Sequence, residues 1–203
     1  MNSSLGQGLV LLGLGAAVFG AVVGLVAGQR QSLRGLRITQ TAAYVFSAAM
    51  VLANLVMIRA LLAHDFSVSY VAHVGSRSTP TLFTIVSLWS SLEGSILFWG
   101  AILGVYVGAF TYSNRDRYRE YMGYALGAIL AISAFFALLL AGPAHPFASV
   151  FPVPSDGPGP NPLLQNHILM VVHPPTLYLG YVGMTIPFGI AVAALLRGRL
   201  SEG

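Results

Sequence analysis

The 203-residue sequence contains no cysteine and no lysine, and only 8% of its residues are charged. Without cysteine, the chain has no disulfide framework, no thiolate nucleophile and no thiolate metal site. Soluble domains carry about 25% charged residues, so the shortage of charge excludes an ordinary soluble protein. The 56% share of hydrophobic residues and the mean hydropathy of +0.76 indicate a membrane protein.

Phosphate-binding glycine loops of the GxGxxG or GxxxxGK[ST] type are also missing from the sequence. Its glycines instead recur at helical spacing, as at Gly20, Gly24 and Gly28 or at Gly123 and Gly127. Small residues at this spacing let helices approach closely in lipid, so we interpret these ridges as packing surfaces. The histidines do not follow the close HxxxH spacing that zinc sites favour.

Five apolar stretches are long enough to cross a membrane, since about 20 apolar residues span the hydrocarbon core. They cover about residues 8–28, 38–62, 82–112, 121–141 and 175–196. We therefore predict an all-α fold, a polytopic bundle of about five transmembrane helices that forms one membrane domain over residues 1–203. The third stretch exceeds the need of a bilayer, so its first turns should project into the interface.

Charge sets the predicted orientation. The net charge is +4, and the arginines form clusters after the first, third and fifth stretches. These are Arg30, Arg34 and Arg37, then Arg115, Arg117 and Arg119, then Arg197 and Arg199. Alternating spans put all three clusters on one side, which the positive-inside rule makes the cytoplasm. The N-terminus is then outside and the C-terminus inside, and the positive charge does not argue for nucleic acid.

The opposite side is expected to hold loops 63–81 and 142–174 and all five histidines of the chain. One interpretation is a functional site at the outer face; the other is that the outer loops are simply longer. Alternation over residues 66–70 suggests a short extended segment. The proline- and glycine-rich stretch 152–162 predicts a turn-rich cap.

Arg59 and Glu93 are expected at the same outer depth, roughly 30 Å from the cytoplasmic edge. Pairing of the two is plausible because a lone charge there is costly. They are either an interfacial ion pair or an arginine positioned for an anionic ligand group and held by Glu93. Trp89 shares a helix face with Glu93 and belongs either to an aromatic belt or to one wall of a flat apolar site.

The segment "HPPTLYLGYVG" starts at His173. Pro174 biases His173 away from helical geometry, and Pro175 fits the first turn of a helix. We therefore expect an imidazole presented at the outer end of the fifth helix, where it is either an interfacial hydrogen-bonding residue or an axial ligand for haem iron. Pro187 should bend the same helix.

Three passages, residues 64–100, 145–166 and 173–200, resemble the N-terminal part of the cytochrome c maturation protein F family. The HPPxLYxGY and WxxxEGSxLxW patterns around His173 and Trp89 carry the resemblance. The resemblance implies that b-type haem is held as substrate or bound group at the outer face of the bacterial inner membrane, for attachment to apocytochrome c. It implies His173 as the metal ligand, with Pro174, Pro175, Tyr178, Trp89, Glu93, Arg59 and Arg77 around the haem.

The same resemblance implies partners: a haem chaperone, a thiol-reducing maturation subunit, apocytochrome c and membrane lipid. The family's WWD segment, second outer histidine and transmembrane histidines are not matched here. We therefore expect a truncated or split form that needs the remaining half of the haem lyase and is inactive alone. The competing interpretation is a structural or transporter-like subunit of a membrane complex without haem, although the predicted span interiors are almost free of ionisable residues.

Overall fold

The computed structural model describes residues 1–162 and 167–198, and within these ranges the chain is all-α, as predicted. Five segments are long and apolar enough to cross a membrane, and α7 together with α8 forms the fifth. The elements are α1 (Asn2–Arg30), α2 (Leu33–Leu62), α3 (Ser69–Val74), α4 (Thr81–Val86), the 3-10 helix η1 (Ser87–Trp89), α5 (Leu92–Ser113), α6 (Arg119–Ala141), α7 (Ile168–Gly183) and α8 (Thr185–Arg197).

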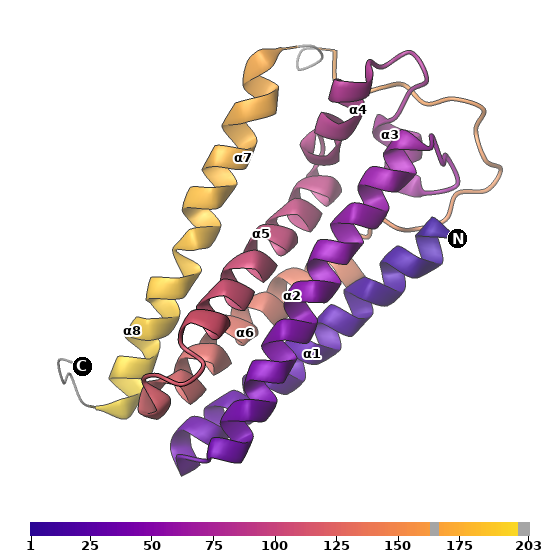
Figure 1. Cartoon of the computed structure of the whole chain (residues 1–203). Helices are drawn as coiled ribbons and strands as arrows, with labels where there is room; N and C mark the ends of the chain where they lie inside the picture. Colours follow the sequence, from indigo (N-terminus) through magenta and orange to yellow (C-terminus); the bar gives the residue numbers. More distant parts are fainter. Residues whose placement is uncertain (163–166, 199–203) are drawn as a thin grey trace.

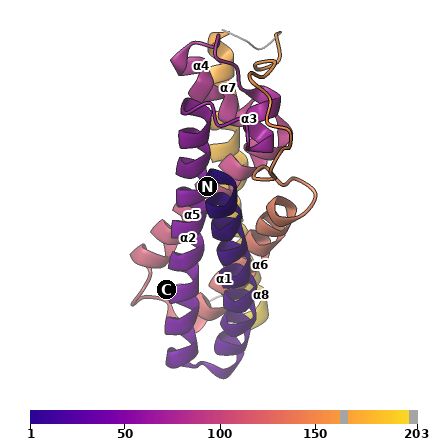
Figure 2. The same cartoon turned by 90° about the vertical axis from the view of Figure 1, so that its right-hand side faces the viewer.

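The long helices run side by side, and the short helices gather at one end of the bundle (Figures 1 and 2). We call this the cap end; it carries α3, α4 and residues 142–162. The other end, here the arginine end, carries the α1–α2 and α5–α6 turns and the end of α8. All described cluster arginines lie there, while Arg199 falls outside the described residues. The five histidines lie at the cap end, as expected from the sequence.

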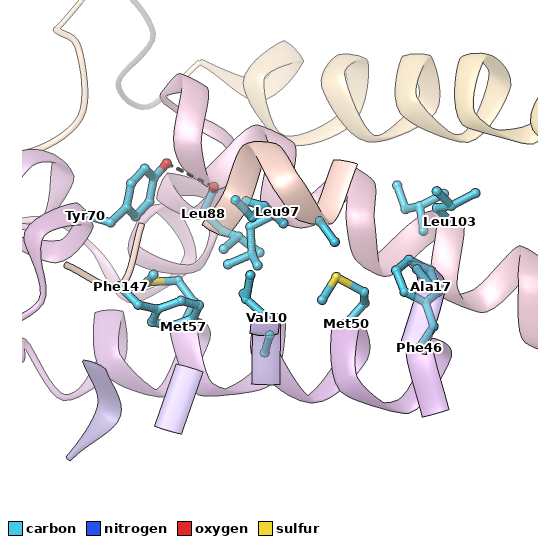
Figure 3. Packing of buried hydrophobic residues seen from close by; sticks show 14 of the residues in the cluster. Val10, Ala17, Phe46, Met50, Met57, Tyr70, Leu88, Leu97, Leu103 and Phe147 are labelled. Atoms are coloured by element: carbon cyan, nitrogen blue, oxygen red, sulfur yellow. Dashed lines mark hydrogen bonds between the residues drawn. The ribbon is translucent and has the colours of Figure 1, made fainter. Parts of the chain in front are cut away.

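Most buried apolar side chains meet in one large core, and Leu36, Met122 and Leu126 form a smaller cluster of their own. Figure 3 shows Val10 and Ala17 of α1, Phe46 and Met50 of α2, and Leu103 of α5 among the members of the large core. Phe147, from the loop after α6, is fully buried and packs against the first turns of α1, where no Cβ would fit at Gly6. The cap is therefore packed onto the ends of the helices as part of the same core.

The glycine ridges pack α1 against α6. A Cβ built on Gly24 would lie 2.9 Å from the Cα of Gly127, and one on Gly123 would lie 2.6 Å from the amide nitrogen of Gly28. Backbone meets backbone at these positions, so no flexible side chain is present that could move aside. The prediction that these glycines serve packing is confirmed.

The third apolar stretch is not one helix, contrary to the expectation from its length. Its first part forms α4 and η1, and α5 begins only after Ser91, whose backbone is extended (φ −139°, ψ 170°). Tyr70 explains the break: its buried hydroxyl donates to the carbonyls of Ser87 (2.8 Å) and Leu88 (3.0 Å). The two carbonyls thus accept from a side chain of another helix, and the chain turns before α5 begins at Leu92.

The fifth stretch also begins differently from the prediction. The helix starts at Ile168, not at Pro175, so His173 lies in the second turn with a helical backbone. His167 caps α7, and its Nδ1 accepts from the amide of Leu169 at 3.2 Å. A short turn at Met184 separates α7 from α8, and Pro187 lies in the first turn of α8.

Hydrogen bonds between its loops hold the cap together. The extended segment expected over residues 66–70 is reduced to Val68, which forms an isolated antiparallel bridge with Ser149, because residues 66–67 turn and α3 already begins at Ser69. Residues 152–162 contain no helix, as expected. The Asp65 carboxylate accepts from the side chains of Asn2 (2.8 Å) and Ser67. Burial raises the pKa of Asp65, but these hydrogen bonds outweigh burial and leave the pKa below its usual value. The loop after α2 is thus tied to the start of α1.

Candidate functional site

Helix α7 carries the His-Pro-Pro sequence and is held mainly by α5 and η1. Only Met170 and Val182 of its residues are buried, so apolar burial contributes little. Three side-chain hydrogen bonds replace it. Trp89 Nε1 donates to the carbonyl of Met170 (2.7 Å), Tyr178 is bonded to Ser95 Oγ (3.2 Å), and Tyr106 donates to the carbonyl of Leu179 (3.0 Å). We call these three bonds the α7 clasp.

The Trp89 bond meets a need that the sequence creates. In an α-helix the carbonyl of residue i accepts from the amide of residue i+4. The residue four positions after Met170 is Pro174, which has no amide hydrogen. Met170 is only 5% exposed, and a buried carbonyl without a donor costs about 1–3 kcal/mol. The Trp89 indole supplies that donor from a different helix.

Aromatic rings fill the space beneath the clasp. Trp89 is stacked on Phe98 with 5.1 Å between centroids and 23° between planes. Tyr178 meets Phe98 and Trp99 edge-on, at 6.1 and 5.1 Å. Trp89 and Tyr178, both predicted around the ligand, therefore lie in the contact between α5 and α7.

His173 lies on a different face of α7. It is exposed, and among the described residues its imidazole has no hydrogen-bond partner. Leu169 and Leu177, four residues before and after it, are 62% and 41% exposed, so helical spacing places an apolar residue one turn to either side. The structure thus separates the predicted residues: His173 faces outwards, while Trp89 and Tyr178 face α5.

The predicted charged residues do not come together. Arg59 is exposed and forms no ion pair or hydrogen bond with any described residue. The Glu93 carboxylate accepts instead from the Ser91 hydroxyl at 3.3 Å. Pairing of Arg59 with Glu93, which the sequence made plausible, is absent from the described part of the chain.

Arg77 is occupied within the cap. Its Nε donates to the carbonyl of Ser155 (3.2 Å), and its guanidinium lies over the ring of Phe66, 5.5 Å from the centroid. The backbone amides of Arg77 and Gly157 donate to Asp156 and hold the pKa of that carboxylate below its ordinary value. Arg77 therefore fastens one cap loop to another.

A groove of about 240 Å³ runs between α2 and α7, with α5 as its floor. Leu55, Ile58, Phe98, Tyr106 and Leu179 contribute to its apolar lining. Asn54, at the groove, donates to the carbonyls of Met50 (3.0 Å) and Leu97 (2.8 Å) and so ties α2 to α5. No cluster of three or more possible metal ligands occurs among residues 1–162 and 167–198.

Sequence reasoning missed Tyr106, Ser95 and the Met170 carbonyl. A tyrosine inside an otherwise apolar stretch was a signal for Tyr106, because a buried phenol needs a partner. The Met170 carbonyl could have been found from Pro174, since every proline in a helix frees the carbonyl four residues earlier. Which side chain would answer it depends on how the helices pack.

Comparison with known proteins gives a consistent result. The family model described as "Cytochrome C assembly protein" matches residues 89–201. The protein CcmF of Pseudomonas fluorescens, a cytochrome c-type biogenesis protein, is 36% identical over 197 residues, covering 97% of this chain and 30% of the relative. CcmF of Escherichia coli (strain K12) is 31% identical over 203 residues, with 100% of this chain and 31% of the relative covered.

Structural comparison agrees. The solved structure described as "Cytochrome c Heme Lyase CcmF" superimposes with a TM-score of 0.85 at 33% identity and covers 98% of this chain. The match covers 31% of that solved chain. This chain therefore spans about a third of the length of the relatives it matches.

Proposed function

The chain belongs to the cytochrome c assembly protein family, and from this premise we propose that it is a haem-handling membrane subunit of cytochrome c maturation. It presents b-type haem at the outer membrane face for covalent attachment to apocytochrome c. Haem is the substrate of this process.

One observation carries the proposal: the imidazole of His173 is exposed, free of described partners and flanked along α7 by exposed leucines. Neutral imidazole is a common axial ligand of haem iron, and a flat macrocycle needs apolar surface beside that ligand. Leu169 and Leu177 supply such surface one helical turn to either side of His173. The residues of this face therefore fit haem.

The chain's own residues have separate parts in this scheme. His173 would bind the iron, while the Trp89 and Tyr178 hydrogen bonds keep α7 on α5. Pro174 and Pro175 shape the helix behind the imidazole. Arg59 is the better candidate for a haem propionate, since Arg77 is already bonded to Ser155. Glu93 would act through its hydrogen bond with Ser91 at the start of α5.

Bound haem supplies two vinyl groups. Each thiol of the apocytochrome adds across one vinyl double bond, so a carbon–sulfur bond forms and the thiol proton ends on the neighbouring carbon. The absence of cysteine from this chain means that none of its own thiols competes for the vinyl groups. The task of the chain is to hold the macrocycle at a fixed place while the thiols reach it.

The proposal includes an orientation and a set of partners. The cap end faces the periplasm and the arginine end faces the cytoplasm of a bacterial inner membrane, in accord with the positive-inside rule. A haem chaperone delivers the substrate, a thiol-reducing subunit keeps the apocytochrome reduced, and the remaining part of the haem lyase completes the site.

Haem titration of the purified chain, alone and co-expressed with the remaining part of the lyase, tests the proposal. We expect a Soret band typical of imidazole ligation that disappears in His173→Ala. His167→Ala is the matched control, because His167 lies at the same end of α7 but its Nδ1 already accepts from the Leu169 amide. Equal spectra for both variants, or no haem even in the co-expressed sample, would favour the structural or transporter-like alternative.

A further inference from the structure

We infer that Trp89 is a positioning residue for His173: its indole N–H takes the place of the helical donor that Pro174 removes. The inference rests on the proposed function for its purpose, because a fixed His173 matters only if that imidazole binds a ligand. The hydrogen bond itself is a property of the fold. It assigns Trp89 a role distinct from a wall of the haem pocket.

The geometry is specific to one carbonyl. Trp89 Nε1 lies 2.7 Å from the carbonyl oxygen of Met170, four residues before Pro174. The next proline, Pro175, frees the carbonyl of Val171, for which the described residues provide no side-chain donor. Thr176 does not compensate, because its hydroxyl donates to Val172 (3.0 Å) and His173 (2.9 Å). Trp89 therefore replaces the missing hydrogen bond to the Met170 carbonyl on the buried side of α7.

Trp89 is itself held in place. Its backbone carbonyl accepts from Ser95 Oγ at 3.1 Å, and Ser95 is also bonded to Tyr178 of α7. The indole is stacked on Phe98 of α5. The donor therefore lies in η1, directly before the firmly packed helix α5. The acceptor, the Met170 carbonyl, lies three residues before His173 on the loosely packed helix α7. The Trp89–Met170 hydrogen bond therefore holds the part of α7 that carries His173 at a fixed position relative to α5.

The bond also depends on the break between η1 and α5. Trp89 is the last residue of η1, and α5 starts at Leu92 after the extended residue Ser91. A continuous helix would carry Trp89 at a different angle to the α5 axis. The Tyr70 hydroxyl, which binds the Ser87 and Leu88 carbonyls, therefore helps to aim the indole at α7.

Spin-label distances test the inference without haem. The cysteine-free chain allows unique labels at Val172 on α7 and Leu62 at the end of α2, both exposed. The variant Trp89→Phe keeps one aromatic ring beside Phe98 but removes the N–H donor together with the second ring of the indole, so a rescue experiment must separate the two losses. We expect a broader distance distribution than in the parent, because the ratio of docked to detached α7 falls about tenfold.

Rescue by Pro174→Ala separates this role from simple packing. Alanine at position 174 restores an amide that can donate to the Met170 carbonyl, so Trp89→Phe should then broaden the distribution little relative to Pro174→Ala alone. Tyr106→Phe is the matched control: it also removes a donor to an α7 carbonyl, that of Leu179, but Pro174→Ala should not rescue it.

Two results would overturn the inference. One is a Trp89→Phe distribution as narrow as that of the parent. The other is equal broadening by Trp89→Phe with and without Pro174→Ala, which would mean that the ring packs and the N–H is dispensable. Because the measurement contains no haem, it stands whether or not His173 binds iron. Suppose that the parent chain gives a narrow distance distribution, that Pro174→Ala rescues Trp89→Phe, and that the haem titration gives no signal. The positioning role of the hydrogen bond would then stand, and only the proposed function would be rejected.

Discussion

Helices α1 and α7 are both apolar and both long enough to contribute to a membrane span, yet they are held in opposite ways. Helix α1 meets α6 through glycines whose backbones are in direct contact. Helix α7 buries only two of its residues and is attached by the three hydrogen bonds of the clasp. Any added side-chain atom at the α1–α6 glycines would clash with backbone. The attachment of α7 depends on a few hydrogen bonds, so the loss of a single donor should weaken it.

This difference indicates a division of labour. Close glycine packing in lipid produces a rigid pair of helices, which serves as a base for the cap. Side-chain hydrogen bonds fix α7 at a few points and leave its other face, with His173, open. Under the proposed function this open face is needed, because haem is a large flat molecule that must reach the His173 imidazole.

The largest effect should come from the rigid contact. Gly127→Val places side-chain atoms against the backbone of Leu25, where even a Cβ would lie 2.8 Å from the amide nitrogen. Overpacking costs about 3 kcal/mol, so we expect a strong loss of folded protein in thermal unfolding monitored by circular dichroism. Gly15→Ala is the control, since nothing lies within 4 Å of a Cβ there; equal losses would show that the glycine contact is unimportant.

The second effect concerns the break before α5. Tyr70→Phe removes the hydroxyl that donates to the carbonyls of Ser87 and Leu88; Ser90 still donates to the Ser87 carbonyl, whereas no other described side chain donates to that of Leu88. We expect unfolding to become easier by about 1–3 kcal/mol, measured by chemical denaturation in detergent. Tyr112→Phe, at a side chain that is 65% exposed, should change stability little. A neutral Tyr70→Phe would mean that the break does not need the hydroxyl.

The third effect sharpens the comparison at α7. Tyr106→Phe removes one bond of the clasp, and a single hydrogen bond contributes about 0.5–1.5 kcal/mol. Hydrogen exchange should speed up in α7 and stay unchanged in α1, because the two helices are held independently. Faster exchange in both helices would contradict the division between a rigid pair and a docked helix.

The smallest effect is a dependence on pH in the cap. The folded-state pKa of Asp65 lies below the ordinary value of 3.8, so its contribution is present above that value and is lost as the pH falls through the folded-state pKa. The bond to Asn2 should weaken in acid, and exchange at the Ser67 amide, which also binds Asp65, should quicken. Asp65→Asn should remove this dependence; an unchanged acid response would assign it to other groups.

Length and hydropathy were sufficient to predict the number of spans and the grouping of arginines and histidines at opposite ends. They did not predict where the third stretch breaks, because residues 82–112 have the pattern of one apolar run. The cause is the Tyr70 hydroxyl, which comes from a separate short helix. Local pattern contains no information about a donor that arrives from elsewhere in the chain.

The start of α7 was mispredicted for a related reason. A proline pair favours the first turn of a helix when only local hydrogen bonds are considered. Here the prolines lie in the second turn, and the lost bond at Met170 is replaced by Trp89. The sequence singled out both Trp89 and His173 but could not show that Trp89 contacts α7 on a face other than the one that carries His173, because that depends on the direction in which α5 approaches.

The central claim is that haem lies on the His173 face at the cap end. Paramagnetic relaxation by ferric haem tests it directly, with single spin labels at Val172 and Leu195, which are 52% and 79% exposed. The two positions are about 35 Å apart along α7 and α8. We predict strong relaxation at position 172, weak relaxation at 195, and loss of the difference in His173→Ala. Equal relaxation at both positions, or a difference that survives His173→Ala, would contradict the claim.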